Sequence, residues 1–145
     1  MCTLGLQICF LLNFYSYNSE TSGYEITMQA NATINSGTYS GKRAIEVCGS
    51  GGNVTINGGT FTGTEYVIHA DFVKDNYSNS ENYESKIVIN GGTFDGGIYI
   101  INDASLEIMG GTFTNTGLTL EQFKAYVPSG YKVSEYNGTY TVTVE

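Results

Sequence analysis

One short motif occurs four times in this chain and constrains its fold more than any other feature. Each copy contains an isoleucine, a corner with at least one glycine, a threonine and an aromatic residue. The four copies are Thr33-Ile-Asn-Ser-Gly-Thr-Tyr39, Thr55-Ile-Asn-Gly-Gly-Thr-Phe61, Val88-Ile-Asn-Gly-Gly-Thr-Phe94 and Glu107-Ile-Met-Gly-Gly-Thr-Phe113. Such self-similarity is typical of repeat architectures, in which each unit buries its apolar face only against its neighbours.

Within one copy, apolar and polar side chains alternate as they do on half-buried strands. In the second copy, Val54 and Ile56 flank Thr55, and the alternation resumes at Phe61 after the corner at 57–59. Asn-Gly and Gly-Gly pairs favour tight corners because both residue types tolerate a positive φ. A further apolar pair follows in the first and third repeats, Ile45 with Val47 and Ile98 with Ile100, so we expect three short strands per repeat.

The spacing of the copies predicts how these strands pair. The second corner glycines are separated by 22, 33 and 19 residues; they are Gly37, Gly59, Gly92 and Gly111. A unit of about 20 residues that holds three strands is typical of one coil of a parallel β-helix. We therefore predict an all-β parallel β-helix solenoid of about four coils. The alternative is a hairpin meander, which would need turns that reverse the chain.

Stacked coils place equivalent residues above one another in rows. The inward isoleucine row is Ile34, Ile56, Ile89 and Ile108. The inward aromatic row is Tyr39, Phe61, Phe94 and Phe113. The corner amide row is Asn35, Asn57 and Asn90, and Met109 interrupts it in the last coil. Stacked aromatic pairs stabilise by about 0.5–1.5 kcal/mol each beyond their burial.

We interpret residues 1–145 as a single domain with three parts. Residues 1–30 form a partial N-terminal coil, 31–115 the coils with the repeated motif, and 116–145 a C-terminal cap. The predicted coils occupy 32–53, 54–86 and 87–105, and a fourth begins at 106.

The first seventeen residues alternate in strand periodicity, with Leu4, Leu6, Ile8 and Phe10 on one face. We interpret them as the remains of an earlier coil, which implies a longer parent protein or a different start. The alternative is a degenerate secretion signal, although no basic residue precedes Lys42. A polar loop over 16–23 and a strand over 24–28 should follow.

The last thirty residues change pattern and predict a cap. Thr119 is suited to cap a short helix that reaches Tyr126, and Pro128 would end it. Two strands over 131–135 and 139–144 should then form a hairpin at an Asn-Gly turn. A solenoid needs such a cap to cover its last apolar coil and to block edge pairing.

The motif copies resemble the coils of the pectate-lyase-like superfamily of right-handed parallel β-helix proteins. More narrowly, residues 24–145 look like adhesin-like repeat proteins on the surfaces of gut bacteria, with their Ile-Asn-Gly-Gly-Thr-Phe coils. The stretch 130–142 resembles the ending of those surface proteins. The resemblance implies a right-handed parallel β-helix and an extracellular or cell-surface location.

The second repeat is eleven residues longer than the first, and the surplus lies within 69–86. In solenoids an insertion in one repeat becomes a loop on one face, often the binding face. Carboxylates and tyrosine rings are side chains that recognise sugars. The candidate binding residues are Asp71, Asp75, Tyr77, Glu81, Tyr83 and Glu84. The alternative is that this segment is a solvent-exposed, mobile loop without function.

Composition excludes some classes of partner. The net charge is −8, which argues against nucleic acid and against anionic membrane surfaces. The three cysteines, an odd number, do not suggest a disulfide framework; they are Cys2, Cys9 and Cys48. Cys48 is expected to be a small buried residue. No cysteine is placed near a histidine, so we expect no zinc site, no other metal and no cofactor.

No catalytic constellation is evident. Pectate-lyase-like enzymes need an Arg or Lys base with grouped calcium-binding aspartates, and polygalacturonase relatives need paired aspartates with further signatures. Asp95 and Glu107 are candidates for a carboxylate pair of the kind that glycoside hydrolysis requires. His69, the only histidine, aligns with inward Val47 or, if shifted by one residue, faces outward.

The sequence thus favours a non-catalytic, adhesin-like surface module that binds glycans or a host surface. One alternative is a carbohydrate-active enzyme, or the remnant of one. Another is a structural spacer without a ligand. Open strand edges at the N-terminal end also predict edge-to-edge self-association.

Overall fold

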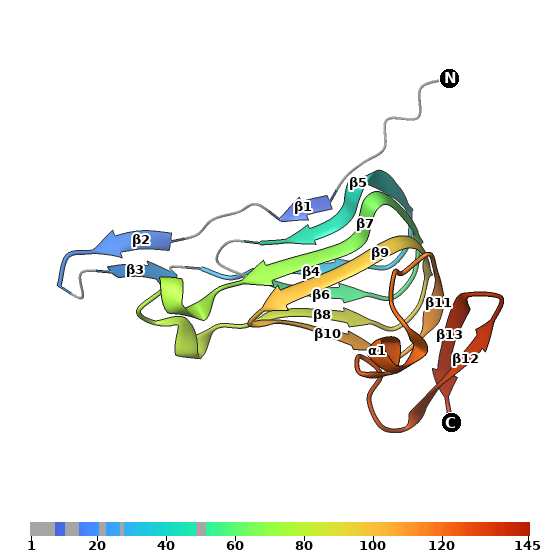
Figure 1. Cartoon of the computed structure of the whole chain (residues 1–145). Coiled ribbons are helices and arrows are strands. Elements are labelled where there is room, and N and C mark those ends of the chain that lie inside the picture. Colours follow the sequence, from blue (N-terminus) through green and yellow to red (C-terminus); the bar gives the residue numbers. More distant parts are fainter. Residues whose placement is uncertain (1–7, 11–14, 21–22, 27, 49–51) are drawn as a thin grey trace, which may run out of the picture.

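The computed structural model describes residues 8–10, 15–20, 23–26, 28–48 and 52–145. Within these residues, thirteen strands, two 3₁₀ turns and one short α-helix follow one another, which confirms an all-β fold (Figure 1). Most strands belong to two sheets, one parallel and one parallel except at its C-terminal hairpin, and the chain passes from one sheet to the other in every repeat.

The smaller sheet contains the first strand of each motif copy. Its order is β10-β8-β6-β4, and all neighbours are parallel. Side chains alternate between buried and half-buried along β6 and β8, as expected for a sheet with one face on a core. The strands are β4 (Ala30–Ile34), β6 (Gly52–Ile56), β8 (Ser85–Ile89) and β10 (Ala104–Ile108).

The larger sheet contains the second half of each repeat, in the order β1-β5-β7-β9-β11-β13-β12. Its parallel strands are β1 (Ile8–Phe10), β5 (Thr38–Val47), β7 (Thr60–Phe72), β9 (Thr93–Asn102) and β11 (Gly111–Thr114). The expectation of three strands per repeat is corrected to two. The predicted second and third strands are continuous in β5, β7 and β9, because the parallel ladder resumes after a register shift in the middle.

The two sheets face one another, and their inward side chains form one core. The isoleucine row lies in register on the smaller sheet, where Ile56 pairs with Ile34 and Ile89. The aromatic row lies on the larger sheet. Ring centroids are 4.9 Å apart for Tyr39 and Phe61, and for Phe61 and Phe94, with nearly parallel planes.

The corners between the sheets also stack. The side-chain amide of Asn57 donates to Asn35 at 2.7 Å, and Asn90 donates to Asn57 at 2.7 Å. Gly59 has a φ of +122°, and a Cβ there would lie 3.0 Å from the backbone oxygen of Gly37. The corner therefore needs glycine both for its backbone conformation and for its close approach to the corner below.

The N-terminal part agrees with its prediction at one strand and differs from it at the following loop. β1 pairs in parallel with β5, so the stretch at 8–10 extends the larger sheet, whereas residues 1–7 lie outside the described part. The expected polar loop over 16–23 is corrected, because β2 (Tyr15–Asn18) forms an antiparallel pair with β3 (Gly23–Ile26).

The long segment between β7 and β8 is packed against β3. It contains the 3₁₀ turns η1 (Lys74–Asn76) and η2 (Ser80–Asn82). The amide of Asn79 exchanges two hydrogen bonds with the backbone of Ile26, at 2.8 and 2.9 Å. These two hydrogen bonds attach the segment to β3 through Asn79 and Ile26, which are 53 residues apart in the sequence.

The C-terminal segment covers the last repeat. Thr119 and Gln122 form a capping box at the start of α1 (Leu120–Lys124). Phe123 of this helix is fully buried, and its ring meets Phe113 edge-on at 5.1 Å. The hairpin of β12 (Tyr131–Tyr136) and β13 (Thr139–Val144) continues the larger sheet, since β13 pairs antiparallel with β11.

Candidate functional site

The register between β7 and β9 breaks near the middle of the two strands. From Thr62 to Ile68, β7 advances by six residues, while β9 advances by three, from Asp95 to Ile98. The surplus residues of β7 must leave the ladder, as in a β-bulge. Gly63 lies at this break, and a Cβ there would come within 1.9 Å of the backbone oxygen of Tyr66.

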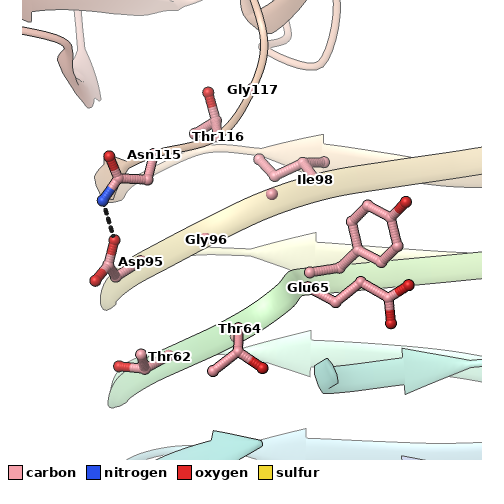
Figure 2. Close-up of a pocket in the computed structure, with 12 residues that line it drawn as sticks. Thr62, Thr64, Glu65, Asp95, Gly96, Ile98, Asn115, Thr116 and Gly117 are labelled. Carbon is pink, nitrogen blue, oxygen red and sulfur yellow. Dashed lines mark hydrogen bonds between the residues drawn. The ribbon is translucent and has the colours of Figure 1, made fainter. Parts of the chain in front are cut away.

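A groove of about 620 Å³ lies over this break. Figure 2 shows its wall formed by β7, β9 and the segment that follows β11. The lining contains hydroxyls, two carboxylates and an amide, together with glycines, the ring of Tyr66 and the apolar side chain of Ile98. The lining residues are Thr62, Gly63, Thr64, Glu65, Tyr66, Asp95, Gly96, Gly97, Ile98, Asn115, Thr116 and Gly117.

One end of the groove is preorganised around Asp95. Its Oδ1 accepts hydrogen bonds from the hydroxyl of Thr114 at 3.0 Å and from the amide of Asn115 at 2.6 Å, the latter drawn in Figure 2. Asn115 has a left-handed φ of 55°. The backbone carbonyl of the next residue, Thr116, accepts a hydrogen bond from the backbone N–H of Ile98 at 3.1 Å. The segment after β11 is thereby fixed along the edge of β9.

The other end of the groove is aromatic and charged. The ring of Tyr66 stacks on Tyr99 at 5.1 Å and on His69 at 5.7 Å. Glu65 forms ion pairs with Arg43 and with Lys42, both at 3.4 Å. Tyr99 is 43% exposed, so this end offers an accessible ring beside polar groups.

Next to the aromatic end, the structure brings a cysteine to the histidine. Cys48 Sγ lies 3.6 Å from Nδ1 of His69, which corrects the expectation that no cysteine lies near it. Cys48 is only half-buried and contacts polar groups, unlike the small buried residue that was expected. Burial, followed by the charges of Glu46 and Asp71, raises the pKa of the Cys48 thiol to about 12.

The outward orientation of His69 follows from a register offset of 23 residues, which pairs it with Glu46. An offset equal to the motif spacing would instead have paired it with Val47. The bulge adds the extra residue, and it lies between the motif and the histidine. The local sequence therefore left both orientations open, and strand pairing decides between them.

Three of the six binding residues predicted on the long segment line a common pocket. Glu81, Tyr83 and Glu84 line a shallow pocket of about 280 Å³ together with Gln29 and Lys74. The other three residues are not among those that line this pocket. Asp71 accepts a hydrogen bond from Asn102 at 2.6 Å, Tyr77 stacks on Phe72 at 6.2 Å, and Asp75 lies in η1 next to Lys74.

Asp95 and Glu107, the candidate carboxylate pair, lie on different sheets. Asp95 on β9 is bound by Thr114 and Asn115 as described above. Glu107 on β10 forms an ion pair with Lys86 at 2.7 Å. Each carboxylate thus has its own neighbours.

The sequence patterns did not predict most of the residues that line the groove, although the sequence contains a sign of the bulge that forms it. The distance from the motif aromatic to the next inward isoleucine is six residues from Tyr39, seven from Phe61 and four from Phe94. Unequal lengths in equivalent segments indicate that one strand must bulge over its neighbour.

No protein-family model, curated protein or solved structure matches the chain. Within the described part of the chain, no helix has the length and apolar character needed to span a membrane.

Proposed function

We propose that this chain is a non-catalytic, adhesin-like surface module that binds glycans in the groove over β7 and β9. The observation that carries the proposal is the groove itself, whose lining combines hydroxyls, carboxylates and an amide with an adjacent tyrosine pair. Its volume falls within the range of small-molecule sites, about 300–1,000 Å³.

We also propose that the two sheets are walls of a right-handed parallel β-helix. Support comes from the regular alternation of the chain between the sheets and from the parallel pairing of equivalent motif residues. In this architecture the bulge is a local departure from a regular stack, and departures of this kind are frequent next to functional sites.

The chemistry of the groove suits a ligand rich in hydroxyls. Thr62 and Thr64 are exposed, and the Asp95 carboxylate retains acceptor capacity beyond its two hydrogen bonds. The carboxylates of Glu65 and Asp95, in a chain of net charge −8, would repel uronic acids and sulfated sugars. Neutral or amino-containing oligosaccharides are therefore the favoured class.

The proposal is tested on a glycan array with the full chain and two matched double variants. Thr62→Val/Glu65→Ala removes one hydroxyl and one carboxylate from the groove. Thr60→Val/Glu81→Ala removes the same groups from exposed positions outside it. We expect binding to neutral or amino oligosaccharides that falls about tenfold or more in the groove variant, because two hydrogen bonds are lost.

The control variant should bind as the unchanged chain does, and circular dichroism should show all three folded. Equal weakening in both variants, or weakening only in the control, would contradict the groove as the site. The bound oligosaccharides should be recovered intact after prolonged incubation. Recovery of shortened products would instead support the carbohydrate-active alternative.

A further inference from the structure

Three side chains with different donor atoms converge on the outer face of β5 and β7. They are Glu46, Cys48 and His69, and we call them the Glu-Cys-His cluster. One donor atom from each lies within 4.8 Å of the other two. Glu46 and His69 are neighbours in the parallel ladder, and Cys48 lies two residues beyond Glu46 on the same face of the strand.

The separations of these donor atoms match the edges of a tetrahedron around a small ion. With ordinary zinc bond lengths, tetrahedral ligands lie about 3.4 Å apart for nitrogen and oxygen, and about 3.6 Å apart when one is sulfur. The observed distance between His69 Nδ1 and Glu46 Oε1 is 3.4 Å, and that between Cys48 Sγ and His69 Nδ1 is 3.6 Å. The third edge, from Cys48 Sγ to Glu46 Oε1, is 3.8 Å.

We propose that the Glu-Cys-His cluster binds a zinc-type divalent ion through Glu46 Oε1, Cys48 Sγ and His69 Nδ1. A donor set of sulfur, imidazole nitrogen and carboxylate oxygen selects zinc over calcium or magnesium, which prefer oxygen ligands. Three protein ligands leave one tetrahedral position for water or for a group of a bound molecule. Binding releases the thiol proton of Cys48 to solvent, because the thiolate is the ligand.

The surroundings orient two of the three ligands. The oxygen Oε1 of Glu46, which is the proposed ligand atom, also accepts a hydrogen bond from Nη1 of Arg43, and this contact holds the carboxylate in place. The His69 imidazole packs beside a pair of tyrosine rings, at 5.7 Å from Tyr66 and 5.8 Å from Tyr99, and these two rings are 5.1 Å from each other. Both ligands are also largely buried, with 9% of Glu46 and 7% of His69 exposed, so few rotamers remain open to them.

The test uses cobalt(II) as a spectroscopic probe of the reduced, chelator-treated full chain. Because Cys2 and Cys9 are also present, a Cys2→Ser/Cys9→Ser variant isolates Cys48. We expect this variant to show thiolate-to-cobalt charge-transfer absorption and the intense visible bands of tetrahedral cobalt. Zinc should displace the cobalt and raise the thermal midpoint of unfolding.

Cys48→Ser should abolish the charge-transfer band, and His69→Gln should weaken cobalt binding by more than about 100-fold, a larger loss than an outer-contact change gives. Glu65→Gln is the matched control, since it changes a carboxylate that also pairs with Arg43 but lies outside the cluster. It should bind cobalt as the parent does.

A parent chain without the thiolate band would overturn the proposal. So would a band that survives Cys48→Ser and is lost in the Cys2→Ser/Cys9→Ser variant. Circular dichroism of each variant separates loss of the site from loss of the fold. None of these outcomes depends on whether the groove binds a glycan.

Discussion

At the scale of residues, the motif aromatics form a continuous stack in the core. Phe61, Phe94 and Phe113 are fully buried, and each ring lies 4.7 to 4.9 Å from the next with interplanar angles of 4° and 7°. Phe61 and Phe94 therefore each contact the aromatic of the repeat on either side, whereas Phe113 contacts Phe94 and the cap residue Phe123. Loss of Phe61 or Phe94 removes contacts with two repeats at once.

Phe94→Ala tests this at the centre of the stack. We expect the free energy of unfolding to fall by about 3–5 kcal/mol, because a large cavity opens between two rings. Chemical denaturation followed by circular dichroism measures the change. Tyr136→Ala, at a side chain that is 79% exposed, should change it by less than about 0.5 kcal/mol. Equal effects from the two changes would rule out a stack that stabilises the fold.

The Cys48 thiol should be alkylated more slowly than its partial exposure alone would suggest. Its raised pKa, about 12, keeps the thiol protonated at pH 8, and the thiolate is the nucleophile. In the Cys2→Ser/Cys9→Ser variant with chelator present, alkylation should be about 100-fold slower than for a free peptide cysteine. The rate should keep rising above pH 10. Glu46→Gln should accelerate alkylation at pH 8, since it removes a negative charge that raises the pKa of the Cys48 thiol. An alkylation rate that levels off by pH 9 would contradict the raised pKa of Cys48.

At the scale of elements, the bulge of β7 builds the groove, and its geometry depends on Gly63. A side chain there would collide with the backbone oxygen of Tyr66 within the same strand. The bulge would have to open, and the positions of Thr62, Thr64 and Glu65 would change with it. Groove shape and local stability are thus coupled at one residue.

Gly63→Ala should lower the free energy of unfolding by about 3 kcal/mol, because the new methyl group has no room. Gly138→Ala is the matched control. Gly138 has a φ of +74° and no heavy atom within 4 Å of an added Cβ, so only backbone strain of about 1 kcal/mol applies. Thermal or denaturant unfolding compares the two. A smaller loss at Gly63 than at Gly138 would mean that the bulge is not constrained as described.

Some elements could be predicted from the sequence, and others could not. The isoleucine and aromatic rows follow from a local motif whose strand period and glycine corners recur in every repeat, for example at Ile56 and Phe61. The docking of the long segment depends on Asn79 meeting Ile26, a contact across 53 residues that no local pattern encodes. The groove was not predicted for a similar reason, because strand pairing with register shifts, and not sequence proximity, brings Glu65 and Asn115 into the lining of one groove.

At the scale of the whole molecule, the C-terminal hairpin protects the larger sheet. β13 occupies the edge of β11, and Tyr140 packs on Phe123 at 4.6 Å between ring centroids. Without the hairpin, β11 would present unpaired backbone groups next to an open apolar surface. Exposed edges of this kind pair with other chains.

A chain that ends at Gly130 should therefore self-associate more than the full chain. Sedimentation at several concentrations should show a higher average mass for the shortened chain, together with lower stability. Tyr136→Lys in the full chain changes the exposed side of the hairpin without uncovering β11, and it should leave the mass unchanged. A shortened chain with the mass and stability of the full chain would refute the protective role.

The central claim is that the groove over β7 and β9 binds oligosaccharides, and amide chemical-shift mapping tests it most directly. The isotopically labelled full chain would be titrated with neutral and amino-containing oligosaccharides. The account predicts saturable shifts confined to residues 62–66, 95–98 and 115–117, which line the groove. Shifts confined to residues 74–84, or no shifts with any of these oligosaccharides, would contradict it.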